Sequence, residues 1–227
     1  MENEIETERF MKKITFHQIV WYFFVFSIFG MIMENIVCLV TTGKIESRKG
    51  FIIGPFCPIY GFGAILLIYV LKAENKWYRI LFYGTLTGTA FEYISSFTMQ
   101  ALYGVKFWNY EKYFLNVNGR TALLYAVSWG ILSLVLMYIA KPMVDKFIDK
   151  YKSKSLDYIM LFFMVINCCL TYNSIQSYAY RASLKYSGID AEYNGLMSNE
   201  VMKVIFPNMI YTSSNNENIL ITDLFKD

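Results

Sequence analysis

The chain has 227 residues, of which 56% are apolar and 19% aromatic, and its formal net charge is only +3. This apolar content lies above that of soluble domains, and the abundant tyrosine and phenylalanine are typical of helices anchored at two membrane interfaces. No soluble stretch carries a basic patch interleaved with aromatics, so we expect no nucleic-acid partner. The composition predicts an all-α, polytopic transmembrane helix bundle in the lipid bilayer.

In chain order, the charged N-terminal residues 1–13 lack the basic start and short apolar core of a secretory signal. The apolar run at about 19–40 is therefore expected to remain as the first transmembrane helix, since about 20 residues span the hydrocarbon core. Four further spans are predicted at about residues 51–71, 77–103, 122–140 and 156–178. The expected domains are a bundle with a short N-terminal extension over 1–180 and a polar C-terminal tail over 181–227.

Basic residues predict the orientation of the bundle. Lysine and arginine are more numerous in the N-terminal segment, the 72–79 turn and the 141–154 loop than in the opposite flanks, and they favour the cytoplasmic side. We expect a multi-pass protein of the cell membrane with a cytoplasmic N-terminus and an external tail. The apolar run at 201–211 is too short to cross and is expected at the surface.

The second predicted span is unusual because it combines an apolar composition with glycine and proline. Pro55 and Pro58 lack backbone donors, and Gly54 is pushed away from helical geometry by the proline that follows it. Two interpretations are open: a kinked helix packed tightly against its neighbours, or a re-entrant, broken segment that lines a cavity. The structural candidates in this stretch are Gly50, Gly54, Pro55, Cys57, Pro58, Tyr60 and Gly61.

Two glutamates lie inside predicted spans, where a central charge costs roughly 2.5–3.5 kcal/mol. Glu34 follows Gly30 by four residues, and Glu92 follows Gly88 in the same way, with Gly84 one turn earlier. Residues four apart share a helix face, so each carboxylate lies on a small-residue face that can pack against another helix. We expect both glutamates to face the interior of the bundle.

Two arginines are the expected partners of these glutamates. Arg48 and Arg120 stand at the predicted outer starts of the second and fourth spans, and a buried carboxylate must be neutral or paired. We therefore expect Glu34 and Glu92 to meet them, directly or through water, in the outer half of the bundle. The order of glycine, glutamate, arginine and a glycine-containing helix occurs twice, which is consistent with two parallel hairpin repeats.

The connection at residues 104–120 contains Trp108, Tyr110 and Asn118, and Trp129 follows in the fourth span. The loop residues either anchor the membrane interface around an Asn-Gly turn or form a lid over the charged cluster. The four cysteines show no metal-ligand spacing and are expected as small buried side chains. His17 is expected as a lone interfacial residue, and we expect no metal or other cofactor.

Together these motifs resemble a known family. The relevant motifs are Gly30-x-x-x-Glu34, Arg48-Lys-Gly-Phe-x-x-Gly-Pro-x-Cys-Pro-x-Tyr-Gly61, Glu92, Trp108-x-Tyr110, Asn118-Gly-Arg120 and Trp129-Gly130. They are similar to those of the putative type IV ABC-transporter permease family, a group of small bacterial integral membrane proteins. The resemblance covers about residues 24–141 and implies a membrane protein of the transporter class.

Three functions remain open on these residues. The chain has no Walker-type Gly-x-x-x-x-Gly-Lys-Ser/Thr motif, so a permease-like subunit would need an ion gradient or a separate ATPase subunit, and a homo-oligomer is the other partner we consider. The alternatives are a structural or accessory assembly factor, whose buried charges set helix register, and a membrane enzyme acting on lipid or envelope precursors. No catalytic residue is assigned, because no nucleophile–base pair is visible.

Overall fold

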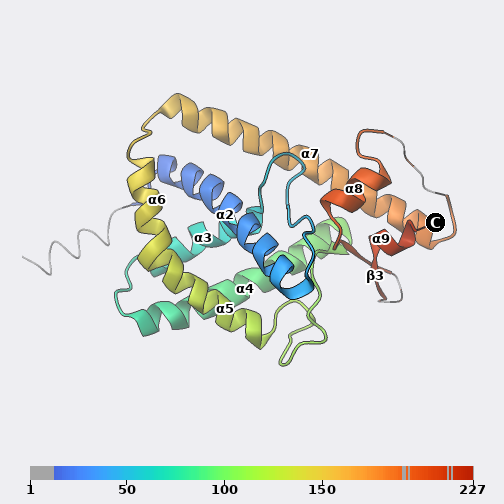
Figure 1. Cartoon of the computed structure of the whole chain (residues 1–227), viewed down its shortest axis with the longest axis horizontal. Helices are drawn as coiled ribbons and strands as arrows, with labels where there is room; N and C mark the ends of the chain where they lie inside the picture. Colours follow the sequence, from blue (N-terminus) through green and yellow to red (C-terminus); the bar gives the residue numbers. More distant parts are fainter. Residues whose placement is uncertain (1–12, 191–192, 194, 214, 216, 227) are drawn as a thin grey trace, which may run out of the picture.

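Helices dominate the computed structural model, which describes residues 13–190, 193, 195–213, 215 and 217–226. Its long helices are α2 (Phe16–Thr42), α4 (Trp77–Tyr103), α7 (Lys154–Tyr186) and the continuous run of α5 (Leu123–Val135), η1 (Leu136–Ala140) and α6 (Lys141–Ile148). The shorter α3 (Pro58–Leu71) packs against both α2 and α4, and α4 packs against α5 (Figure 1). The bundle is thus built from two neighbouring helix pairs, α2–α3 and α4–α5.

Local signals explain where these helices begin and end. The Thr15 hydroxyl accepts a hydrogen bond from the Gln18 backbone N–H, and the Gln18 side chain accepts one from the Thr15 N–H, which together form a capping box before α2. Gly43 and Gly104 end α2 and α4 in left-handed conformations, each with φ of 70°. The Ser153 hydroxyl caps α7 in the same way as Thr15 caps α2.

Three helical segments are long and apolar enough to cross a membrane: α2, the Leu123–Ile148 run and α7. They coincide with the first, fourth and fifth predicted spans. Among the described residues, α4 has the length but not the apolar composition, and α3 has only 14 residues, or about 21 Å against a core of about 30 Å. The prediction of five spans is therefore not confirmed.

The second predicted span is broken rather than kinked. Residues 51–57 are not helical, and α3 begins only at Pro58, where the missing N–H is harmless. The buried amide of Asn167 on α7 bonds to both the N–H and the carbonyl of Ile53, at 3.1 and 2.6 Å. The Thr171 hydroxyl likewise accepts from the Ile52 N–H at 3.0 Å. These bonds replace helical ones, so the irregular backbone stays satisfied inside the bundle.

The expected polar tail is instead folded into a C-terminal cap, made of α8 (Asn199–Ile205), β2 (Ile210–Thr212), β3 (Asn218–Leu220) and α9 (Ile221–Leu224). Strand β1 (Val105–Lys106) follows α4 and pairs antiparallel with β2, which pairs with β3. Figure 1 shows the cap gathered around the far end of α7, so the expected boundary at residue 180 falls inside that helix. This small sheet also corrects the all-α prediction.

The cap has its own apolar core, separate from that of the bundle. Met202, Met209 and Ile221 are fully buried against Tyr178 and Ala182 of α7. The run at 201–211, expected at the surface, supplies part of this core. Its burial could not be predicted from the segment alone, because it depends on α7 and β1, which lie far away in the sequence.

Candidate functional site

Glu34 and Tyr60 form the first half of the candidate site. The Tyr60 hydroxyl on α3 donates to the Glu34 carboxylate on α2. Gly30 makes this contact feasible, because a Cβ at that position would lie 2.2 Å from Cγ of the Tyr60 ring. The ring therefore lies against the glycine, and its hydroxyl reaches the carboxylate one turn further along α2.

The second Gly-x-x-x-Glu motif has a matching arrangement on α4. A Cβ at Gly88 would lie 2.5 Å from Cγ of the Trp129 indole on α5, and this indole also approaches the Glu92 carboxylate. The rings of Tyr60 and Trp129 stack on each other, with centroids 6.1 Å apart. This aromatic pair is thus one of the contacts between the two helix pairs, and each helix pair contributes a glutamate beside it.

Glu92 is buried, with 5% of its surface exposed, and its two oxygens accept hydrogen bonds from hydroxyl groups. The Thr121 hydroxyl donates to one oxygen at 2.7 Å, and the Tyr110 hydroxyl donates to the other at 3.3 Å. Tyr110 in turn stacks on Tyr125 with centroids 3.8 Å apart. Burial first, and then the nearby charges of Glu92 and Glu34, raise the pKa of the Tyr110 phenol, so this side chain stays a neutral donor.

We call this group the glutamate–tyrosine cluster. Its members come from four helices and from the connection between α4 and α5, and they are Glu34, Tyr60, Glu92, Tyr110, Thr121, Tyr125 and Trp129. Prediction from sequence missed Thr121 and Tyr125. A signal exists for Tyr125, because positions 125 and 129 lie four residues apart on α5 and share a face. Thr121 precedes this helix and gave no such signal.

Arg120 connects the 104–120 loop to α4 through side-chain hydrogen bonds. Its guanidinium donates to Ser96 Oγ at 3.1 Å and to Gln100 Oε1 at 2.5 Å, and it lies 5.5 Å from the centroid of the Phe97 ring. The Trp108 indole N–H donates to the Arg120 carbonyl at 2.9 Å. Trp108 and Arg120 thus hold the loop in place, and Tyr110 from the same loop enters the cluster.

Arg48 binds near the end of α2. It donates to Cys38 Sγ at 3.2 Å and lies 3.7 Å from the Glu46 carboxylate. Within the described part of the chain, neither Arg48 nor Arg120 forms a direct ion pair with Glu34 or Glu92. Hydroxyl groups, and not the two arginines, donate hydrogen bonds to Glu34 and Glu92. A contact of the arginines with these glutamates through water stays a prediction.

The other predicted residues position helices and loops. A Cβ at Gly61 would lie 2.3 Å from Ser27 Oγ on α2, and one at Gly84 would lie 2.3 Å from Ser133 Oγ on α5. Cys57 precedes α3 as its N-cap residue, and its backbone N–H donates to the Ser27 carbonyl at 2.9 Å. Gly50 lies against the Pro58 ring, and Gly54, before Pro55, has a left-handed φ of 81°. The Asn118 side chain donates a hydrogen bond to the Tyr93 hydroxyl.

A second polar group, at the opposite end of α2, was not predicted. His17 Nδ1 lies 2.7 Å from Asp157 Oδ1, and the Trp21 indole N–H donates to the same oxygen at 3.1 Å. His17 is therefore not a lone interfacial residue. Asp157 gave no signal in the sequence, because an aspartate in the first turn of a helix is an ordinary preference.

The cysteines match the expectation only in part. Cys38 is buried, but Cys168 and Cys169 are exposed on the surface of α7. Among the described residues, no group of three or more histidine, cysteine, aspartate or glutamate side chains is arranged to hold a metal ion.

These features define an integral membrane helix bundle with two carboxylates between its helix pairs. The chain belongs to the family described as "Putative ABC-transporter type IV", whose model matches residues 21–175, well over half of its length. The matched region contains both Gly-x-x-x-Glu motifs and ends inside α7. No curated protein and no solved structure gives a match. The family match and the long apolar helices together indicate a membrane protein with a transporter-like role.

Proposed function

We propose that this chain is the permease-like subunit of a transporter and works with a separate ATPase or an ion gradient. The observation that carries the proposal is the pair of carboxylates, Glu34 and Glu92, which bond to hydroxyl groups and to no cation within the described residues. Ionisable groups inside a membrane bundle are costly and mark substrate or ion pathways. The glutamate–tyrosine cluster is the part of the path that takes up a proton or a cationic group.

The position of the cluster between two helix pairs supports this role. Each pair presents a glycine, a glutamate one turn later and an aromatic side chain from the following helix. This repeated arrangement supports two parallel hairpin repeats, which can shift against each other at the Tyr60–Trp129 contact. The 104–120 loop acts as a lid, because its Tyr110 reaches Glu92. With a cytoplasmic N-terminus, Glu34 lies in the outer half of α2.

A structural or accessory role in membrane assembly is the second candidate. It is favoured by one observation, namely that both oxygens of Glu92 already have donors in a site with 5% exposure. A fully bonded buried carboxylate can fix the register of α4 against α5 without any transport. The two candidates differ in what a neutral substitute does.

The first experiment is a tagged purification from native membranes in mild detergent, with partners identified by mass spectrometry. A stoichiometric ATPase partner is expected. Glu34→Gln and Glu92→Gln are then expected to keep the abundance and the partner but to lose ATP-driven activity of the complex in proteoliposomes. Glu74→Gln is the matched control, because Glu74 pairs with Arg79 outside the cluster.

Two results would count against parts of the proposal. Purification of the chain alone, or with envelope enzymes, would count against the ATPase partner and leave an ion gradient as the energy source. Loss of abundance in both glutamine variants, with no separable activity, would favour the assembly role.

A further inference from the structure

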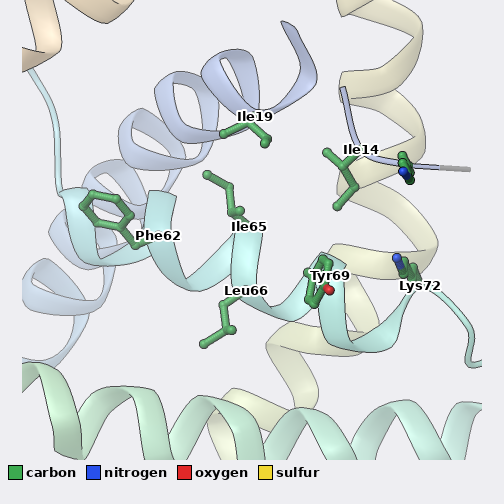
Figure 2. A pocket seen from close by; sticks show the side chains of 8 residues that line it. Ile14, Ile19, Phe62, Ile65, Leu66, Tyr69 and Lys72 are labelled. Carbon is green, nitrogen blue, oxygen red and sulfur yellow. The ribbon is translucent and has the colours of Figure 1, made fainter. Parts of the chain in front are cut away.

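An apolar groove runs along one face of α3 (Figure 2). Its volume is about 550 Å³. Phe62, Ile65, Leu66 and Tyr69 line it from α3 at the spacing of a single helix face. The remaining lining residues are Lys13, Ile14, Ile19 and Lys72. The groove is therefore apolar along its length and basic where the lysines lie.

The shape of the groove matches an elongated amphipathic ligand. Phe62 and Lys72 lie at opposite ends in Figure 2, and the separation of ten positions along the chain corresponds to roughly 15 Å of helix. Lys72 Nζ lies 4.7 Å from the centroid of the Tyr69 ring, which keeps the ammonium at its end of the groove. Phe62 and Tyr69 are 57% and 61% exposed, so in a bilayer these walls face lipid.

Among the residues that the structure describes, the positive charge at the basic end has no ion-pair partner. Neither Lys13 nor Lys72 forms an ion pair with any other residue the structure describes. Glu74, two residues beyond Lys72, is paired with Arg79 at 3.6 Å. The N-terminus of α2 begins three residues after Lys13 and adds a partial positive charge. An anion at this end would meet two ammonium groups and a helix N-terminus.

We propose that this groove binds one anionic phospholipid of the surrounding bilayer. One of its two acyl chains lies along Phe62, Ile65 and Tyr69, and its phosphate lies between Lys13 and Lys72. The apolar wall distinguishes this ligand from free phosphate, and the two lysines distinguish it from a zwitterionic lipid. The site is independent of the glutamate–tyrosine cluster and of the proposed transport role.

Native mass spectrometry of the delipidated full chain tests the proposal, with phosphatidylglycerol and phosphatidylcholine as probes. The wild type is expected to retain one phosphatidylglycerol in preference to phosphatidylcholine. Lys13→Ala combined with Lys72→Ala is expected to weaken phosphatidylglycerol binding roughly tenfold. Lys146→Ala with Lys150→Ala is the matched control, because both lysines are exposed and lie at the same end of the bundle.

The apolar wall is tested separately. Ile65→Trp fills the groove and is expected to reduce phosphatidylglycerol binding although both lysines remain. Ile159→Trp on the exposed surface of α7 is the control and is expected to change nothing. Thermal unfolding followed by circular dichroism confirms that each variant is folded.

Three outcomes would overturn the proposal. They are equal retention of the two lipids by the wild type, an unchanged lipid preference after removal of Lys13 and Lys72, and displacement of phosphatidylglycerol by millimolar inorganic phosphate. The last outcome would indicate a simple phosphate site.

Discussion

Gly30 leaves the space that the Tyr60 ring occupies, and this contact places the Tyr60 hydroxyl at Glu34. Gly30→Ala is expected to destabilise the bundle, because the new Cβ would lie 2.2 Å from the ring and α3 would have to shift. The loss should be about 1–3 kcal/mol, measured as thermal unfolding in detergent. In a Tyr60→Ala background the same change should cost little, and an equal cost in both backgrounds would contradict the contact.

Thr121 supplies the shorter of the two hydroxyl hydrogen bonds to Glu92, at 2.7 Å. Thr121→Val keeps the shape but leaves a buried carboxylate oxygen without its donor, which is expected to cost about 1–3 kcal/mol. Thr121→Ser keeps the hydroxyl and is expected to behave like the wild type. Equal melting temperatures for the valine and serine variants would show that the hydroxyl does not support Glu92.

At the scale of elements, α2 and α7 are joined by the buried contact of Asp157 with His17 and Trp21. Asp157 is 3% exposed and is the shared hydrogen-bond partner of His17 and Trp21. Asp157→Ala therefore leaves both of these side chains without that partner. A clear fall in melting temperature is expected, because unpaired buried polar groups cost about 1–3 kcal/mol each.

The matched control for that change is Asp149→Ala. Asp149 pairs with Lys152 in a contact where both side chains are about 70% exposed, and such surface pairs contribute little. A similar loss of stability in both alanine variants would indicate that α2 and α7 are not held together through Asp157.

At the scale of the whole molecule, the C-terminal cap holds the loop after α4 through the pairing of β1 with β2. Met209→Asp places a charge in the cap core, where Met209 is fully buried. The cap is expected to open and to let trypsin cleave at the buried Lys106 and at the already exposed Lys112, because the loop backbone is no longer held, while the bundle stays folded. Val204→Asp, at a side chain that is 73% exposed, should leave the cleavage pattern unchanged.

A failure of this prediction has a distinct signature. Protection of both lysines from trypsin in the Met209→Asp variant would mean that the 104–120 loop is held by Arg120 and Trp108 alone. The cap would then be dispensable for the position of Tyr110 over Glu92.

The family, the membrane class and three long apolar helices could be predicted from the sequence. Apolar length is a local property, and a run of about 20 apolar residues has few other stable environments. The structure brings both glutamate motifs to the Tyr60–Trp129 pair. That both glutamates face the interior of the bundle within a membrane stays a prediction. Their four-residue spacing was informative because it is also local.

The partners of these local motifs were decided by tertiary packing. The glutamates bond to Tyr60, Tyr110 and Thr121 instead of directly to arginine, since Arg120 reaches Ser96 and Gln100 further along α4.

Long-range contacts also decided the backbone of the second predicted span and the fate of the tail. The broken span is satisfied by Asn167, 114 residues away, and the tail folds because β1 and α7 cover its apolar side. The sequence by itself therefore determined the three long apolar helices and the membrane class. Only the tertiary structure determined which groups meet, because burial and hydrogen bonding between distant segments leave no periodic pattern within either one.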